Sequence, residues 1–281
     1  MNDRNVATTK TQARTDAAQR LAARFSMQGR RALITGGSVS IGRAIALAFA
    51  DAGANVAIHH CAAADAAFGK PNAASETANE IAARGVRAFA IEADFAISGE
   101  AKRTVAAASD ALGGVDVLVV CASIQYRVPF EDVTAEQIER QTRINFNATV
   151  ELLRAALPPM KARRFGRVLT IGSINQTRPE AELTIYAALK SAQHNLAINL
   201  ARQYTPFGVA INNLSPGLIA TERNKWRRED ANVWAAIERD SSPMARAGTP
   251  DELAGAALLL CSDAGSFITG ADLQVTGGRH L

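Results

Sequence analysis

The chain of 281 residues is 48% hydrophobic, 5% aromatic and 21% charged, which provides enough apolar content for a full core and excludes wholesale disorder. Its longest apolar runs fall well short of the roughly 20 residues that a membrane-spanning helix needs, so we expect a soluble protein without a membrane partner. The formal charge is +4, but residues 1–27 carry five basic and two acidic side chains and thus hold three of the four charges. The remainder is almost neutral, which disfavours nucleic acid as a partner.

The three cysteines, Cys61, Cys121 and Cys261, are far apart and form no Cys-x-x-Cys pair. An odd, scattered set indicates neither a disulfide framework nor a zinc site, so we expect no metal and a reducing compartment. No secretory leader opens the sequence, and the expected location is the cytoplasm.

Residues 1–27 are rich in Ala, Thr, Gln and Arg and contain too few bulky apolar side chains to order themselves alone. We interpret them as a flexible or arm-like N-terminal extension. An organelle transit peptide, which is also arginine-rich and poor in acids, is the alternative. Residues 28–281 then form one continuous domain.

Short apolar runs typical of strands alternate with longer segments of helical period from Arg31 onward. The predicted strands are 32–35, 55–59, 88–92, 115–120, 167–171, 209–214 and 272–276, and the predicted helices are 41–52, 74–84, 99–112, 135–157, 185–204 and 250–260. Two helices have capping-box starts, Thr134 with Gln137 and Thr249 with Glu252. The alternation predicts an α/β fold: a single doubly wound Rossmann-type domain with a parallel sheet of about seven strands and helices on both faces.

In such a sheet ligands bind beyond the carboxyl ends of the strands, so residues that directly follow strands are candidates for chemistry. The first strand runs into a glycine-rich turn, residues 35–43, that opens a helix. Free N–H groups and the helix dipole there suit a pyrophosphate, although a tight turn without a ligand has the same composition. Asp94 ends the third strand, where it is either an acceptor for an adenine amino group or a helix-capping acid.

Tyr186 and Lys190 are four residues apart in a predicted helix, so their side chains share one face. A phenol is a poor proton donor or base at neutral pH, but a cation about 5 Å away lowers its pKa by about two units. Ser173 follows the fifth strand and Asn145 lies within the long predicted helix 135–157. Each residue alone has a structural interpretation, as a turn hydroxyl, a helix-kinking amide or a solvated lysine.

Together these motifs resemble the short-chain dehydrogenase/reductase family from about Arg30 to the C-terminus. The family's first turn, Thr-Gly-x-x-x-Gly-x-Gly, is matched at Thr35, Gly36 and Gly42, but Ser40 replaces the middle glycine. A second departure is residues 120–123, Val-Cys-Ala-Ser, where the family has Asn-Asn-Ala-Gly.

The resemblance implies an NAD(P)-dependent enzyme that transfers a hydride between nicotinamide and a carbonyl or secondary alcohol. Tyr186 would then transfer the proton, Ser173 would orient the substrate oxygen, Lys190 would hold the nicotinamide ribose, and Asn145 would position a proton-relaying water. The residues expected to bind the dinucleotide are Thr35, Gly36, Ser38, Ser40, Ile41, Gly42, His60, Asp94, Phe95, Ala122, Ser123, Tyr186, Lys190, Pro216, Gly217, Ile219 and Thr221.

NAD and NADP are distinguished at the end of the second strand, where an acid binds the ribose 2′-OH and repels a 2′-phosphate. His60 stands at that position. Because the repelling carboxylate is missing there, we favour NADP over NAD, with Lys70 as a side chain able to reach the phosphate. The resemblance also implies a homotetramer, and small residues on the two central helices permit close helix contact.

Polar and basic residues flank the expected nicotinamide site, and we assign Gln125, Arg127, Asn175 and Arg178 to the substrate. Residues 218–248 include a polar, arginine-rich stretch and are interpreted as a mobile lid. The segment 125–127 resembles the gluconate 5-dehydrogenase branch, which favours a sugar acid or polyol. Reduction of a 3-oxoacyl carrier protein is the alternative, and a catalytically silent dinucleotide-binding sensor or scaffold is the alternative from another class.

Overall fold

A computed structural model describes residues 16–281 of the chain. Its sheet has seven strands in the order β3-β2-β1-β4-β5-β6-β7, and every neighbouring pair is parallel. The predicted doubly wound α/β architecture is therefore confirmed. The strands are Arg31–Thr35 (β1), Asn55–His60 (β2), Ala88–Glu92 (β3), Val117–Val120 (β4), Gly166–Ile171 (β5), Val209–Pro216 (β6) and Asp272–Val275 (β7). The strand order reverses between β1 and β4, which is where such folds bind their ligands.

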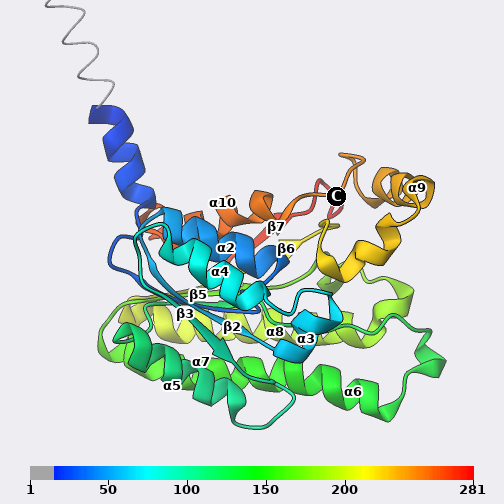
Figure 1. Cartoon of the computed structure of the whole chain (residues 1–281), viewed down its shortest axis with the longest axis horizontal. Coiled ribbons are helices and arrows are strands. Elements are labelled where there is room, and N and C mark those ends of the chain that lie inside the picture. The colour runs from blue at the N-terminus through cyan, green and yellow to red at the C-terminus, as the bar shows by residue number, and fades with distance from the viewer. Residues whose placement is uncertain (1–15) are drawn as a thin grey trace, which may run out of the picture.

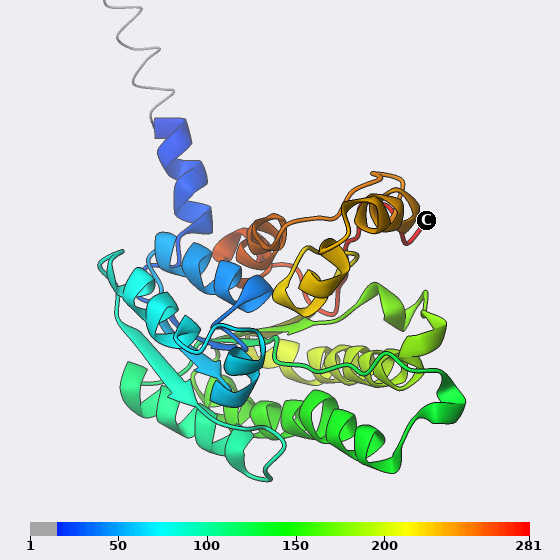
Figure 2. The same ribbon diagram turned by 45° about the vertical axis from the view of Figure 1, so that its right-hand side comes forward.

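Helices cover both faces of the sheet (Figures 1 and 2). One face carries α2 (Ser40–Asp51), α4 (Ala73–Ala82) and α10 (Pro250–Cys261), and the other carries α5 (Glu100–Leu112), α7 (Ala148–Ala162) and α8 (Thr184–Tyr204). Neighbouring residues of one strand serve different cores: Leu118 packs in the cluster beneath α5 and α7, and Val119 in the cluster beneath α2 and α10. Because successive side chains of a strand point to opposite faces, a strand buried on both sides needs apolar residues at both positions.

The predicted helix starts are confirmed at two places. Thr134 caps α6 (Ala135–Thr142), and its backbone N–H is bound in return by the Gln137 side chain, with both hydrogen bonds 3.2 Å long. Thr249 and Glu252 form the equivalent box at the start of α10. Each box satisfies two backbone donors that the first turn of a helix leaves without a partner.

The predicted helix 135–157 differs from the structure in one informative respect. It comprises α6, a π-helical turn (η2, Arg143–Asn147) and α7, which continues to Ala162. A π-turn adds a residue to a helical turn and changes the direction of its side chains, a feature that often marks functional sites. The predicted site residue Asn145 lies inside this turn.

Within residues 28–281, two further helices lie in segments for which no helix is predicted. Helix α3 (Ala62–Ala67) follows β2, and α9 (Ala231–Ser241) follows a 3-10 segment (η6, Glu222–Arg228) within the polar stretch before α10. Both border the carboxyl end of the sheet in Figure 1. The remaining short 3-10 segments are Phe130–Asp132, Ile174–Gln176, Ala181–Leu183, Thr205–Phe207 and Asp263–Gly265.

The N-terminal part of the described chain is a helix over residues 16–25 that stands away from the sheet and is largely exposed (Figure 1). The packed body begins at Met27, which is fully buried and donates its backbone N–H to Ala52 O at 2.8 Å. The rest of the predicted extension, residues 1–15, lies outside the described residues. Within residues 16–281 no helix combines the length and the apolar character needed to cross a membrane.

Candidate active site

A cavity of about 460 Å³ opens at the carboxyl edge of the sheet, beside the switch point between β1 and β4. Its walls come from the segments that follow β1 to β6, from α3, from the start of α8 and from η6, which belongs to the segment 218–248 interpreted from the sequence as a lid. This is the location that the predicted topology gives for ligand binding. All the predicted dinucleotide residues line it except Thr35, and so do three of the four predicted catalytic residues.

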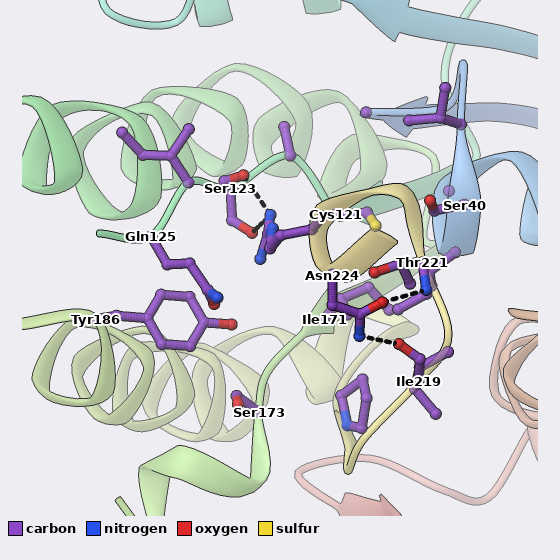
Figure 3. Close-up of a pocket in the computed structure, with 18 of the residues that line it drawn as sticks. Ser40, Cys121, Ser123, Gln125, Ile171, Ser173, Tyr186, Ile219, Thr221 and Asn224 are labelled. Atoms are coloured by element: carbon purple, nitrogen blue, oxygen red, sulfur yellow. Dashed lines mark hydrogen bonds between the residues drawn. The ribbon is translucent and has the colours of Figure 1, made fainter. Parts of the chain in front are cut away.

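Tyr186, Lys190 and Ser173 come together at one end of this cavity. Figure 3 shows the Tyr186 hydroxyl pointing into the cavity, with Gln125 and Ser173 on either side of it. Lys190 Nζ lies 5.8 Å from the centre of the Tyr186 ring, because the two residues are one turn apart on α8. The arrangement places a phenol, a hydroxyl and an ammonium group around one small volume.

Lys190 is buried and tightly held. Its Nζ donates to Ile171 O at 2.6 Å and to Gln193 Oε1 at 3.0 Å. Burial, with a smaller contribution from the nearby charge of Arg223, lowers the pKa of Lys190 from 10.5 to about 7. The lysine therefore changes its charge within the neutral pH range.

Asn145 stands behind the cavity rather than in its wall. Its side chain accepts from Ile124 N and donates to Ile124 O, both at 2.8 Å, and its own residue is 1% exposed. The oxygen and the nitrogen of the amide are therefore both bonded to the backbone of the segment that follows β4. Asn145 thereby fixes the path of the segment that carries Ser123 and Gln125 into the cavity.

Ser173 is positioned by its own loop. The Oγ accepts from Asn175 N at 3.1 Å and from Asn175 Nδ2 at 3.3 Å, while Asn175 Oδ1 accepts from Glu180 N. Asn175 was assigned to the substrate from the sequence, and it does line the cavity, but its side chain is occupied in holding Ser173 and the 173–180 loop.

The glycine turn after β1 is shaped to accept a phosphate. A Cβ at Gly42 would collide with the carbonyl oxygen of Gly36, so the turn needs glycine there. Helix α2 has no side-chain cap at Val39 and no acid in its first turn. Its first N–H groups and the positive end of its dipole therefore face the cavity without an intramolecular anion.

Two residues of this turn have structural tasks as well. Thr35 lies behind the cavity, where its Oγ1 accepts from Cys121 N at 2.9 Å and from Ala122 N at 3.1 Å, joining the ends of β1 and β4. Ser40, at the family's glycine position, has a left-handed φ of 51°. Its Oγ accepts from Glu222 N at 3.1 Å and so joins the glycine turn to the lid.

A flat platform closes the far end of the cavity. The His59 ring stacks on Phe95 with centroids 3.8 Å apart and an interplanar angle of 5°. Gly36 N donates to His59 Nδ1 at 3.2 Å, which leaves Nε2 as the donor to Ala93 O at 3.0 Å. Burial lowers the pKa of His59 to about 4, so the ring is neutral near pH 7. Asp94 also lines this end, and it accepts from Ala96 N at 2.8 Å, the local turn contact that the sequence left open.

The lid segment is tied at its base. Gly248 N donates to Leu218 O and Ala220 N donates to Gly248 O, both at 2.9 Å. From this stem η6 reaches across the cavity, where Arg223 donates to Ser123 O at 2.6 Å and to Ser123 Oγ at 3.0 Å (Figure 3). Lys70 does not line the cavity, because it pairs with Glu222 of the lid at 3.4 Å.

The rim beside Tyr186 is rich in guanidinium groups. Glu180 bridges Arg127, at 2.6 Å, and Arg279, at 3.1 Å, and Arg127 also reaches Glu182 at 3.1 Å. Arg227 lines the same rim but forms no hydrogen bond or ion pair with any part of the chain that the structure describes. Burial and the repulsion of Arg127 and Arg279 lower the pKa of Arg227, while the two glutamates raise it.

The structure brings Gln125, Arg127 and Asn175 to the cavity but not Arg178, whose side chain is exposed outside it. The sequence assigned no site role to Asp65, Glu180 or Arg279, which also line the cavity. Asp65 is the one acid among residues 61–70, an alanine-rich stretch directly after β2, and that pattern was the available clue. Glu180 and Arg279 are 99 residues apart, and no local pattern pairs them.

The chain is similar to known proteins over most of its length. A family model described as enoyl-(acyl carrier protein) reductase matches residues 36–280. The chain is 36% identical over 252 residues to L-rhamnose 1-dehydrogenase (NAD(P)+) of Azotobacter vinelandii, covering 89% of this chain and 96% of that protein.

Two solved structures are also similar. One is a 3-oxoacyl (acyl-carrier-protein) reductase from Agrobacterium tumefaciens with NADP bound, with a TM-score of 0.86, 40% identity and coverage of 93% of this chain and 98% of that one. The other is described as an NAD(P)-dependent gluconate 5-dehydrogenase from Beutenbergia cavernae with bound NADP, with a TM-score of 0.82, 34% identity and coverage of 91% and 98%.

The fold and the cavity define a nicotinamide-dinucleotide oxidoreductase of the Rossmann type. More particularly, the chain belongs to the short-chain dehydrogenase/reductase family. It is an NAD(P)-dependent enzyme that acts on a small molecule, and its cofactor is NADP or NAD.

Proposed function

We propose that the enzyme oxidises and reduces a sugar acid or polyol at a secondary alcohol carbon, with Tyr186 as the group that transfers the proton. The observation that carries the choice of substrate is the guanidinium of Arg227, which lines the rim of the cavity over the Trp226 ring, at 6.0 Å, and has no hydrogen bond or ion pair within residues 16–281. A charged group held in this way is available to a carboxylate of the substrate.

The bound dinucleotide supplies or accepts the hydride. Tyr186 protonates or deprotonates the substrate oxygen, and Ser173, held in place by Asn175, donates a hydrogen bond to the same oxygen. Lys190 stabilises the phenolate form of Tyr186 and holds the nicotinamide ribose. Asn145 keeps the 123–125 segment in position through its two hydrogen bonds to Ile124, and its amide is therefore not free for the proton-relaying water predicted from the sequence.

For the dinucleotide we propose the residues assigned from the sequence. The N–H groups of residues 40–42 bind the pyrophosphate, supported by the uncapped start of α2. Asp94 and Phe95 border the adenine end, and Ala122 and Ser123 border the nicotinamide end, as do Ile219 and Thr221. Thr35 contributes from behind by joining the ends of β1 and β4.

Of the five arginines that line the cavity, three lie with Glu180 and Glu182, and this group carries one positive charge in excess. Arg127 and Arg279 are neutralised by Glu180 and Glu182, so the excess charge resides on Arg227. A buried or half-buried charge without a partner is costly, and a substrate carboxylate relieves that cost on binding. Gln125 completes the site with an amide that hydrogen-bonds sugar hydroxyls beside Tyr186 (Figure 3).

A pair of substrates that differ only in the carboxylate tests this proposal. We expect gluconate to be oxidised with a kcat/KM at least ten-fold above that of glucitol, in assays run with both NAD and NADP. Arg227→Gln should raise KM for gluconate about ten-fold, the effect of losing one charge-assisted hydrogen bond, and leave glucitol almost unchanged.

Arg239→Gln is the matched control, because Arg239 lies on α9 of the same lid, is exposed and pairs with its neighbour Asp240. Arg239→Gln should leave the KM values for gluconate and for glucitol unchanged. If Arg227→Gln raised KM equally for gluconate and glucitol, a contact with the carboxylate would be contradicted. Turnover of 3-oxoacyl thioesters without any turnover of sugar acids or ketoses would overturn the substrate choice.

Reduction of a 3-oxoacyl carrier protein is the second candidate. It is supported by the 40% identity to the Agrobacterium reductase and by exposed basic residues of the lid, such as Lys225 and Arg228, which would meet an acidic carrier. A catalytically silent sensor is contradicted by any dinucleotide-dependent turnover; binding of the dinucleotide without turnover on a broad carbonyl panel would favour it.

We further propose a cytoplasmic homotetramer in which the two central helices, α7 and α8, pair between subunits, residues 218–248 act as the lid and residues 1–27 act as an arm. Exposed Ala188 and Ile198 on α8 are consistent with a helix contact. Light scattering on the full chain measures the mass directly, and a monomer would contradict the assembly.

A further inference from the structure

A buried acid lines the adenosine end of the cavity and has no task in the chemistry described above. Asp65 on α3 is 3% exposed, and its Oδ1 accepts from Ser38 Oγ at 2.8 Å. Its Oδ2 faces His60 Nδ1 at 3.3 Å, an ion pair when that imidazole is protonated, and accepts no hydrogen bond from any other group of the described chain. Because a carboxylate oxygen with a single neighbouring donor keeps further acceptor capacity, a ligand hydroxyl can add a hydrogen bond in this corner.

The neighbouring strand ends identify which part of the dinucleotide meets this corner. The glycine turn after β1 suits the pyrophosphate, and Phe95 after β3 borders the adenine pocket. Between them lies the end of β2, where doubly wound folds contact the ribose that carries the 2′-OH or the 2′-phosphate. Ser38, His60 and Asp65 line the cavity at this point, so the ribose hydroxyls fall within reach of the carboxylate.

The acid comes from an unexpected part of the chain. The end of β2 itself has His60 and no carboxylate, which is why the sequence favoured NADP. Asp65 lies five residues later, and α3 folds back so that its side chain returns to the strand end. Helix α3 therefore places an acid in the ribose corner without a change in β2.

We propose that Asp65 sets the ratio of affinities for the two dinucleotides. Its carboxylate accepts hydrogen bonds from the ribose hydroxyls of NAD, and its negative charge weakens the binding of the 2′-phosphate of NADP. The cavity still binds both NAD and NADP, and Asp65 changes the ratio of the two affinities. The inference depends on dinucleotide binding and is independent of which alcohol is oxidised.

Binding of NADH and NADPH to the full chain, measured by titration calorimetry without a sugar, tests the proposal. Asp65→Asn keeps the shape and the acceptor for Ser38 but removes the charge. We expect its Kd for NADPH to fall and its Kd for NADH to rise, so that the ratio of the two shifts at least ten-fold toward NADPH. Asp65→Ser, a smaller residue, should shift the ratio in the same direction.

Glu76→Gln is the charge-matched control, because Glu76 lies on the nearby helix α4 and is exposed. The ratio of the Kd values for NADH and NADPH in Glu76→Gln should equal that of the wild type. A parallel change of both Kd values, or an unchanged ratio in the two Asp65 variants, would overturn the assignment and leave Asp65 as a structural partner of Ser38. If the wild type bound neither dinucleotide, the enzyme assignment itself would fail, and the two failures are thus distinguishable.

Discussion

The floor of the cavity and its rim hold their polar side chains in different ways. On the floor, Thr35, Asn145 and Lys190 are buried and bonded to backbone atoms of neighbouring strand ends. On the rim, Arg127 and Arg227 are partly exposed; Arg127 pairs with glutamates, and Arg227 lies over the Trp226 ring without a hydrogen bond or ion pair in the described chain. Backbone contacts fix a side chain rigidly, whereas exposed ion pairs are weak and screened by salt. The residues that carry the chemistry are therefore held rigidly by the core of the fold, whereas the residues proposed to select the substrate lie in a more weakly held surface layer.

The largest effect on stability should come from the floor. Asn145→Leu leaves the N–H and the C=O of Ile124 without their partners, at a cost of about 2 to 4 kcal/mol in the free energy of unfolding. Asn147→Leu, on the exposed side of the same π-turn, should cost less than about 1 kcal/mol. Urea denaturation of both variants measures the difference, and equal losses would contradict the role given to the Ile124 contacts.

A second test uses pH. His59 has a pKa of about 4 in the folded chain and about 6.5 when unfolded, so the unfolded state takes up a proton first as the pH falls. The stabilisation is complete above about pH 6.5, declines as the pH falls, and is lost below about 4; its size is of the order of 3 kcal/mol.

Removing the imidazole should remove this dependence. The difference in unfolding free energy between the wild type and His59→Asn should narrow steadily between pH 7.5 and pH 4.5. A difference that stays constant over this range would show that His59 is not a buried neutral ring.

The smallest effect should come from the junction of floor and lid. Ser40→Gly removes the cost of a left-handed φ and also the bond to Glu222 N, so we expect its stability to stay within about 1 kcal/mol of the wild type. Ser40→Ala keeps the strained φ and loses the bond, and should be destabilised by about 1 kcal/mol. Both should increase hydrogen exchange in residues 222–228. If hydrogen exchange in residues 222–228 were unchanged in both variants, the role given to the contact between Ser40 and Glu222 would be contradicted.

The same contrast separates what the sequence predicts from what it does not. The seven strands and the long helices were predicted within a few residues, since burial on two faces and the helical period leave local patterns. The π-turn at residues 143–147 and the short helix α3 leave no such pattern. The first depends on one extra residue within a helix, and the second is too short to show a period.

The floor residues were likewise accessible from spacing, since Tyr186 and Lys190 occupy one helical face and Ser173 directly follows a strand. The rim was accessible only in part. Arg178 was assigned to the substrate by its position after β5, but its side chain is exposed outside the cavity. The Glu180 contact to Arg279 joins segments 99 residues apart, and only the folded chain brings them together.

The central claim is that Tyr186 transfers the proton in an NAD(P)-dependent hydride transfer. The most direct measurement is the initial rate of NADH or NADPH formation from gluconate by wild-type enzyme and Tyr186→Phe, with the Kd of each dinucleotide determined in parallel. Loss of the hydroxyl should lower kcat about 10³-fold and leave both Kd values within about two-fold. Turnover by Tyr186→Phe equal to that of the wild type would contradict the account.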